Sequence, residues 1–545
     1  MMEETHEDME RPPPYTRSGR RKSFLLSVVS TTLYVLLLIL SLMLLFMLLP
    51  RSLFNSNCVW AGEGRRCFWP FTRQPPVVLI TFDGFRHDYI DMVREQMGSN
   101  ALPNFARLER TGVRANQTIP VFPTLTMPNH QTLVTGLYPQ HHGVTGNNLF
   151  DHNYPNTLFI MKNQTTLNES PWLDDWPEPI WMTLQRAGGL VGSLLWPMTD
   201  RPIRDDLPFQ QVSQFIQLNG YPTNYLFSKR VHDLMWWVQN SRFQLDLILA
   251  YFNEPAQTGH LYGPTSRETL TKVVQMDVVL GQILDGLEKF NMTDEINLIL
   301  TSDHGMAQTS STKVIPLDTY VSPQLYTYSY LSPMGAIYPK QGKEQEVYDK
   351  LKYAHEHLHV YWLKDVPTEL HFNRSNSRMP PLVLIPDMEW SIAHTVNDPI
   401  PSGSDGYPNT DSDMHTFLIA SGPSFRVGER VTETHAIDMY ALLCALTFVH
   451  PKPHNGSLTR IAQILKPEVA KYLLQIEHWP HWMSWFVLEM QYLWIAIGLL
   501  VLIFLFVALC FSSVMQRKQT RRAHSSLGGF PTPPDYNRLD KELYT

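Results

Sequence analysis

The sequence predicts an α/β domain with a mostly parallel sheet sandwiched by helices, an inserted subdomain and two transmembrane helices. Three observations predict it. Short runs are apolar at every position, stretches with helical spacing lie between them, and two long apolar segments lie near the ends of the chain. Hydrophobic residues make up 43% of the 545 residues and charged residues only 17%, so the chain can bury a large core.

The apolar runs have the length of strands, and a strand that is apolar on both faces is covered by helices on both sides. They lie at residues 77–82, 191–195, 245–251, 296–301 and 416–420. Helix-like stretches at 102–110 and 267–290 have apolar residues at helical spacing. The interval 321–392 holds fewer such runs and many prolines, which favours an inserted, partly antiparallel subdomain.

The two long apolar segments are residues 24–49 and 492–514. As helices they would be about 39 Å and about 34 Å long, enough to cross a hydrocarbon core of about 30 Å. A cleaved signal peptide is the alternative for the first segment. Its length, the 23 residues that precede it and the lack of small residues before Pro50 favour a membrane anchor.

Basic residues flank the outer ends of both spans, which predicts cytosolic tails at 1–23 and 515–545. The stalk 50–74, the main domain 75–470 and the juxtamembrane segment 471–491 then lie outside the cytosol. All the N-x-S/T sequons fall on that side, as glycosylation requires. They begin at Asn116, Asn163, Asn168, Asn291, Asn373 and Asn455. Cys58 and Cys67 lie close together on the same side and are candidates for a disulfide. The net charge of −7 gives no reason to expect nucleic-acid binding.

Polar residues follow three of the predicted strands. Asp83 follows the first strand, Asp303 and His304 follow the strand at 296–301, and Glu254 and His260 follow the strand at 245–251. Ligands of open α/β sheets bind at the carboxyl ends of the strands. Each residue alone is more often a helix cap or a loop histidine. Together they favour a metal site, since carboxylate oxygen and imidazole nitrogen are common zinc ligands.

Ordered motifs between residues 76 and 466 make the chain resemble the ectonucleotide pyrophosphatase/phosphodiesterase family of the alkaline-phosphatase superfamily. The motifs are Thr81-Phe82-Asp83-Gly84-Phe85-Arg86, Pro123-Thr124-Leu125-Thr126-Met127-Pro128-Asn129-His130, Gly146-Asn147, Glu254-Pro255, Gly259-His260, Ser302-Asp303-His304-Gly305-Met306 and Arg378-Met379-Pro380-Pro381. The resemblance implies an alkaline-phosphatase-like fold for residues 75–470 and hydrolysis of phosphodiesters or pyrophosphates with zinc as the cofactor.

By the same resemblance, Thr126 is the nucleophile that forms a covalent phospho-enzyme intermediate. Asp83, Thr126, Asp303 and His304 are implied to hold the zinc on the nucleophile side. Asn147 is implied to donate a hydrogen bond to a phosphoryl oxygen.

The second zinc site of the family is incomplete here. Its three ligands are an Asp and a His in one run and a His in a later motif. This chain has Ala256, His260 and Asp405 at those positions, so two ligands remain at most. Catalytic zinc usually has three protein ligands. Glu254, Asp411 or Asp413 are alternatives for the missing one.

The substrate is implied to be a nucleotide or a lipid phosphodiester, with Met127 after the nucleophile and Tyr221 as candidate contacts. Two functions stay open: a hydrolase that is impaired or has a rebuilt second site, and a non-catalytic descendant that binds partners outside the cell.

Both predicted cytosolic tails contain a Pro-Pro-x-Tyr motif, at residues 12–15 and 533–536. WW domains bind such segments as preformed polyproline II helices. The sequence therefore predicts WW-domain proteins as partners. Residues 536–539 also fit a tyrosine-based sorting signal.

Overall fold

The computed structural model describes residues 58–61, 64–67, 74–154, 157–160, 175–199, 202–212, 226–239 and 245–477, with separate helical residues between 497 and 514. The chain divides into two compact units, residues 54–478 and a second unit of 1–53 with 479–545. Nearly everything described belongs to the first unit. No helix in this described part is long and apolar enough to cross a membrane. The predicted span 24–49 and part of 492–514 lie outside the described residues.

The first unit is built on an eight-stranded sheet with the order β20-β4-β19-β10-β3-β9-β7-β8. The strands are β3 (Val77–Phe82), β4 (Gly112–Ile119), β7 (Val191–Leu194), β8 (Gln210–Val212), β9 (Leu247–Phe252), β10 (Asn297–Thr301), β19 (Thr416–Ser421) and β20 (Glu429–His435). β19 runs antiparallel to both neighbours, and all other neighbouring strands pair in parallel. The predicted mostly parallel α/β sheet is confirmed.

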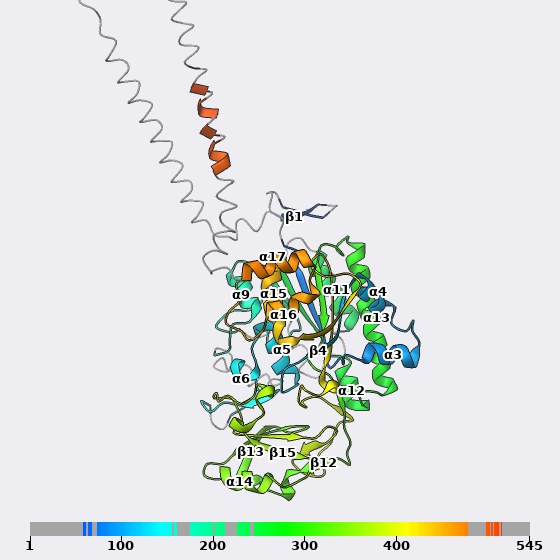
Figure 1. Cartoon of the computed structure of the whole chain (residues 1–545), viewed down its shortest axis with the longest axis vertical. Coiled ribbons are helices and arrows are strands. Elements are labelled where there is room, and N and C mark those ends of the chain that lie inside the picture. The colour runs from blue at the N-terminus through cyan, green and yellow to red at the C-terminus, as the bar shows by residue number, and fades with distance from the viewer. Residues whose placement is uncertain are drawn as a thin grey trace, which may run out of the picture. The chain divides into compact units, whose positions relative to one another are not determined.

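Side chains alternate between the two faces of the sheet, and each face is covered by helices (Figure 1). In β3, Val77 and Leu79 join one core, while Val78 and Ile80 join the other. The first core contains α5 (Thr126–Thr135), α9 (Ile180–Arg186), α15 (Met439–Thr447), α16 (Leu458–Ile461) and α17 (Pro467–Glu477). The second contains α3 (Tyr89–Met97), α4 (Pro103–Thr111), α11 (Phe227–Gln239) and α13 (Arg267–Lys289). Because both faces of the sheet are buried under helices, the central strands need apolar residues at every position.

The predicted inserted subdomain contains a separate four-stranded sheet in the order β13-β14-β16-β15. Its strands are β13 (Tyr326–Tyr330), β14 (Gly335–Pro339), β15 (Leu358–Trp362) and β16 (Leu382–Pro386), all antiparallel, with α14 (Glu344–Leu351) between β14 and β15. One hydrophobic core lies within residues 315–392, and a second joins the subdomain to Phe122 and Leu125, just before α5. It lies at the end of the main sheet that also carries α12 (Ala256–Tyr262) (Figure 1).

Short elements complete the described chain. They are β1 (Cys58–Ala61), β2 (Gly64–Cys67), β5 (Asn148–Phe150), β6 (Leu158–Ile160), β11 (Ala307–Gln308), β12 (Val314–Pro316), β17 (Ser391–Ala393), β18 (Gly403–Ser404) and α6 (Pro139–His142). Single 3-10 turns lie at Leu317–Thr319, Pro323–Leu325, Leu363–Asp365, Thr368–Leu370, Ser412–Met414, Ala436–Asp438 and Ala462–Ile464.

Candidate metal centre

Two parallel strands of the main sheet end side by side, and the residues that follow them converge. Thr81 of β3 pairs with Thr301 of β10, so Asp83 and the Asp303–His304 pair leave the sheet at the same edge. One ligand atom from each of Asp83, Asp303 and His304 lies within 4.8 Å of the others, and all three residues are buried. Three of the five residues predicted from the strand ends thus form a cluster that could hold a metal ion, whereas Glu254 and His260 are not members of it.

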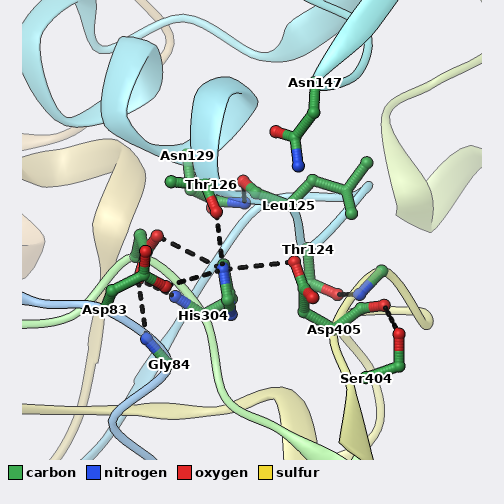
Figure 2. Close-up of polar contacts among 12 residues, drawn as sticks. Asp83, Gly84, Thr124, Leu125, Thr126, Asn129, Asn147, His304, Ser404 and Asp405 are labelled. Atoms are coloured by element: carbon green, nitrogen blue, oxygen red, sulfur yellow. Dashed lines mark hydrogen bonds and ion pairs between the residues drawn. The ribbon is translucent and has the colours of Figure 1, made fainter. Parts of the chain in front are cut away.

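His304 is oriented by its neighbour, because Nδ1 donates a hydrogen bond to the carbonyl oxygen of Gly305 over 2.8 Å. Its Nε2 lies 3.3 Å from Oδ1 of Asp83 (Figure 2). The same nitrogen lies 3.3 Å from Oδ2 of Asp303. In the neutral form of this imidazole, Nε2 carries the lone pair. This is the tautomer that a metal ligand needs.

In each of the two carboxylates, one oxygen accepts a hydrogen bond and the other does not. Asp83 Oδ2 accepts a hydrogen bond from the hydroxyl of Tyr251, and Asp303 Oδ1 accepts one from the backbone N–H of Gly84 at 3.2 Å. Asp83 Oδ1 and Asp303 Oδ2 are buried, and neither has a hydrogen-bond partner among the described residues. Because unpaired buried carboxylate oxygens are costly, this pair fits a divalent cation.

The electrostatics of the cluster point the same way. Burial raises the pKa of Asp303, and the neighbouring charge of Asp83 raises it further. Burial also raises the pKa of Asp83. Burial opposes protonation of His304, but the charges of the surrounding carboxylates outweigh it and raise the pKa of that imidazole. Without a cation, bound protons would offset this negative charge, and a bound cation would take their place.

Thr126 is the first residue of α5, and this position brings its hydroxyl to the cluster. Oγ1 lies 3.2 Å from His304 Nε2 (Figure 2). The backbone N–H of the next residue, Met127, donates to Oδ1 of Asn147 over 3.0 Å. That bond leaves the amide N–H groups of Asn147 available beside the nucleophile. The side chain of Met127 is buried in the core under the sheet.

The other half of the expected two-metal site is different. His260, in α12, donates from Nδ1 to the carbonyl oxygen of Gly403 over 2.8 Å, which directs Nε2 toward Asp405. The Asp405 carboxylate lies 3.5 Å from His260 Nε2 and 3.2 Å from His304 Nε2. Asp405 is thus shared between the two halves. Ala256 is buried and supplies no ligand.

Two of the carboxylates considered as replacements have other partners. Glu254 accepts hydrogen bonds from the backbone N–H and the hydroxyl of Thr258, at 3.0 and 3.1 Å. Asp413 forms an ion pair of 2.9 Å with Arg86. With Glu254 and Asp413 engaged in these contacts, Asp405 and His260 are the ligand groups that the structure brings together on this side.

Three supporting residues were not identified from the sequence as parts of the site. Tyr251 holds Asp83, as described above. His130, one turn into α5, donates from Nδ1 to the carbonyl oxygen of Thr126 over 2.8 Å and contacts Thr81 Oγ1 through Nε2 at 3.0 Å. Arg86 donates to the carbonyl oxygen of Met306 over 3.0 Å. His130 and Arg86 both lie in the family motifs, so their place there was the available signal. No sequence signal marked Tyr251 as part of the site, because it lies within an apolar strand.

The remaining predicted positions are placed as follows. Asn116, Asn291 and Asn455 are exposed and Asn373 is half-buried, whereas Asn163, Asn168 and Tyr221 lie outside the described residues. The backbone register of β1 and β2 pairs Cys58 with Cys67. Both proline–tyrosine motifs also lie outside the described residues. Glycosylation, the disulfide and WW-domain binding stay predictions.

Comparisons with known proteins agree with the geometry. Residues 77–408 match the family described as type I phosphodiesterase / nucleotide pyrophosphatase. Human ectonucleotide pyrophosphatase/phosphodiesterase family member 5 is 36% identical over 402 residues, which cover 73% of this chain and 80% of the relative. Human bis(5'-adenosyl)-triphosphatase ENPP4 is 32% identical over 387 residues, covering 70% and 80%.

The similarity extends to solved structures. An inactive threonine-to-alanine variant of murine ENPP5 in complex with AMP superimposes with a TM-score of 0.66 at 35% identity, covering 72% of this chain and 100% of that structure. Human ENPP5 gives the same TM-score of 0.66 at 36% identity, with 72% of this chain covered.

Proposed function

The chain belongs to the ectonucleotide pyrophosphatase/phosphodiesterase family, and from this premise we propose that it hydrolyses phosphodiester or pyrophosphate bonds through Thr126 with one zinc ion. The observation that supports the proposal most is the 3.2 Å distance between Thr126 Oγ1 and His304 Nε2. It places an alcohol nucleophile beside a buried Asp–Asp–His cluster. Family membership alone would not establish this arrangement of nucleophile and metal ligands, since one fold hosts many functions.

Asp83, Asp303, His304 and Thr126 would hold the ion. A bound zinc supplies a Lewis acid that polarises a phosphoryl oxygen and favours the deprotonated threonine hydroxyl. Thr126 Oγ1 attacks phosphorus, and the bond from phosphorus to the leaving oxygen breaks. A water molecule then hydrolyses the phosphothreonine and regenerates the hydroxyl. That a threonine-to-alanine variant of murine ENPP5 is inactive fits this role for a threonine.

Two further features of the chain would bind the phosphoryl group. At the N-terminus of α5, Met127 donates to Asn147 and Pro128 has no N–H, so the backbone N–H of Thr126 is the donor that this helix end would offer to an anion. Asn147 would donate from its amide N–H groups, because its Oδ1 is occupied by the backbone N–H of Met127. Both donors are fixed before the substrate binds, which is the condition for stabilising charge that develops in the transition state.

We propose that turnover is slow, because the second metal site lacks a ligand. Ala256 supplies none, and Asp405 divides its contacts between His260 and His304. Losses around a zinc site cost about 10- to 100-fold in affinity or activity even when the ligands themselves are intact. A protein that binds but does not turn over substrate is the second candidate, and Ala256 is the residue that favours it.

The substrate is proposed to be a nucleotide phosphodiester. Relatives are named for bis(5'-adenosyl)-triphosphatase activity, and murine ENPP5 was solved with AMP. The test is hydrolysis of bis(p-nitrophenyl) phosphate by the full-length protein before and after treatment with EDTA. Hydrolysis that EDTA removes and added zinc restores supports a metal-dependent hydrolase. No hydrolysis at any zinc concentration overturns it in favour of the binding protein.

The membrane topology and the cytosolic partners are proposed from the sequence. Two membrane spans at 24–49 and 492–514 would place the domain outside the cytosol and both tails inside. The motifs at 12–15 and 533–536 would bind WW domains of cytosolic partners. Peptides with these motifs should bind a WW domain, and Tyr15→Ala or Tyr536→Ala peptides should not. Equal binding by the substituted peptides would remove this part of the proposal.

A further inference from the structure

The inserted subdomain contacts the surroundings of the nucleophile through Tyr330, the last residue of β13. Tyr330 belongs to the hydrophobic core that also contains Leu125, the residue directly before Thr126. β13 also lies against β5, which begins at Asn148, one residue after Asn147. The subdomain therefore supports both sides of the proposed phosphoryl site, the side of the nucleophile and the side of the amide donor.

Tyr330 holds residues 145–147, which we call the Asn147 segment, at two points. Its hydroxyl donates to the carbonyl oxygen of Thr145 over 3.0 Å. Its ring lies directly against Gly146, because a Cβ added to that glycine would come within 2.2 Å of Cε1 of Tyr330. The φ of Gly146 is not in the left-handed region, so the lack of space, and not the backbone conformation, excludes a larger residue there.

The remaining contacts of the Asn147 segment also lead to fixed groups. Thr145 Oγ1 donates to the carbonyl oxygen of Arg378 over 3.2 Å. Arg378 in turn forms a buried ion pair of 2.8 Å with Asp151. On the opposite side, Oδ1 of Asn147 accepts the backbone N–H of Met127 over 3.0 Å. A shift of the segment would therefore move the amide of Asn147 relative to the nucleophile.

A buried tyrosine in a sheet is often a packing residue whose hydroxyl has found a partner. Tyr338, in the neighbouring strand β14, fits that description. Its hydroxyl lies 3.4 Å from the carbonyl oxygen of Arg378, and its ring packs on Phe150 with centroids 5.0 Å apart. Both tyrosines are 9% exposed. Tyr330 differs because its ring and its hydroxyl both contact the Asn147 segment.

We propose that Tyr330 is a positioning residue for phosphoryl transfer, an inference that rests on the function proposed above. Its ring and hydroxyl fix the Asn147 segment, so that the amide N–H groups of Asn147 meet a phosphoryl oxygen as charge develops in the transition state. A donor that is held in place beforehand stabilises this charge without reorganising. A small misplacement of such a donor lowers the rate, even when its cause lies away from the reacting atoms.

The test uses the full-length, zinc-loaded protein and two readouts. One is kcat for bis(p-nitrophenyl) phosphate, and the other is the dissociation constant of orthovanadate, a mimic of the five-coordinate transition state, measured by calorimetry. Tyr330→Phe removes only the hydroxyl and should lower kcat and weaken vanadate binding at least about threefold, with zinc content unchanged. The matched control Tyr338→Phe should keep the parent values of both.

A double-mutant cycle with Asn147→Ala separates positioning from general support of the fold. In the Asn147→Ala background, Tyr330→Phe should cause no further loss of kcat or of vanadate affinity, because the donor that it positions is gone. Gly146→Ala adds a methyl group against the Tyr330 ring. It should weaken vanadate binding more in the parent than in the Asn147→Ala background.

Parent values of kcat and vanadate affinity in Tyr330→Phe would overturn the proposal. So would a loss of zinc in that variant, an equal loss of vanadate affinity with and without Asn147, or an equal loss in Tyr338→Phe. A parent protein that binds vanadate but does not hydrolyse the diester would contradict only the proposed hydrolysis, and the vanadate cycle would still decide the role of Tyr330. A parent that does neither would overturn both proposals.

Discussion

Asp405 Oδ2 lies 3.2 Å from Nε2 of His304, the same distance that separates Thr126 Oγ1 from that nitrogen. The family pattern has a histidine in place of Asp405. A carboxylate here adds negative charge beside the nucleophile-side cluster and still reaches His260 at 3.5 Å. The departure from the pattern therefore affects both halves of the site, and the predictions below separate the halves.

Thr126→Ala should lower hydrolysis of bis(p-nitrophenyl) phosphate by about 10³-fold or more, because it removes the attacking oxygen. Thr126→Ser keeps an oxygen at the same position and should retain more activity than Thr126→Ala. The measurement is the initial rate at saturating zinc. Equal rates in the parent and Thr126→Ala would show that the observed hydrolysis does not use this residue.

Ala256→Asp combined with Asp405→His should complete the ligand set around His260. The double variant is expected to bind one more zinc than the parent and to hydrolyse the diester at least about tenfold faster. Each single variant should gain less, since the ligands of one ion act together. Single variants whose gains add up to that of the double variant would contradict a shared metal site.

His142 should make the domain sensitive to acid. It is buried, and Nδ1 accepts a hydrogen bond from the backbone N–H of Val144 over 3.0 Å. Burial lowers its pKa to about 3 from the usual 6.5. The folded state thus keeps the imidazole neutral while the unfolded state takes up a proton. The stability is complete above pH 6.5 and is lost progressively as the pH falls toward the folded-state pKa.

The variant His142→Asn keeps an acceptor for Val144 and cannot be protonated. Urea denaturation at pH 7.5 and pH 5.0 should show that the variant loses about 2 kcal/mol less free energy of unfolding than the parent over this interval. The same loss in both proteins would mean that His142 does not titrate on unfolding.

Tags on the two termini should be digested by protease only after cells are permeabilised, because both tails are proposed to be cytosolic. Glycosidase treatment should lower the mass of the full-length protein, and Asn116→Gln, at an exposed sequon, should lower the mass before treatment. A terminal tag that is digested on intact cells would contradict the two-span topology.

The strands of the sheet centre were predictable because they are apolar on both faces. The predicted run 77–82 has the bounds of β3, and 296–301 begins one residue before β10. β4 and β20 were missed because they are polar: β4 contains Arg114, which is buried only because Asp91 and Glu109 pair with it at 2.9 and 2.7 Å. Such pairing depends on tertiary structure and leaves no periodic signal.

The nucleophile-side residues were predictable from motifs and strand ends, but the position of Asp405 was not. It reaches the site because β19 runs antiparallel, so the chain that leads into β19 arrives at the edge where β3 and β10 end. The position of Asp405 in the motif was readable from the sequence. Its contact with His304 is explained only by the direction of β19. The ion pair of Asp413 with Arg86 also depends on this arrangement, whereas the hydrogen bonds of Glu254 are local, to Thr258.

The central claim, one zinc ion beside Thr126 and slow hydrolysis, is tested most directly by counting the zinc ions that the full-length protein binds in equilibrium dialysis. The account predicts one zinc per chain, its loss in Asp303→Asn, and EDTA-sensitive hydrolysis well below the typical enzyme range of about 1–10³ s⁻¹. Two zinc ions per chain with turnover inside that range would contradict it, and would mean that Asp405 and His260 form a complete second site.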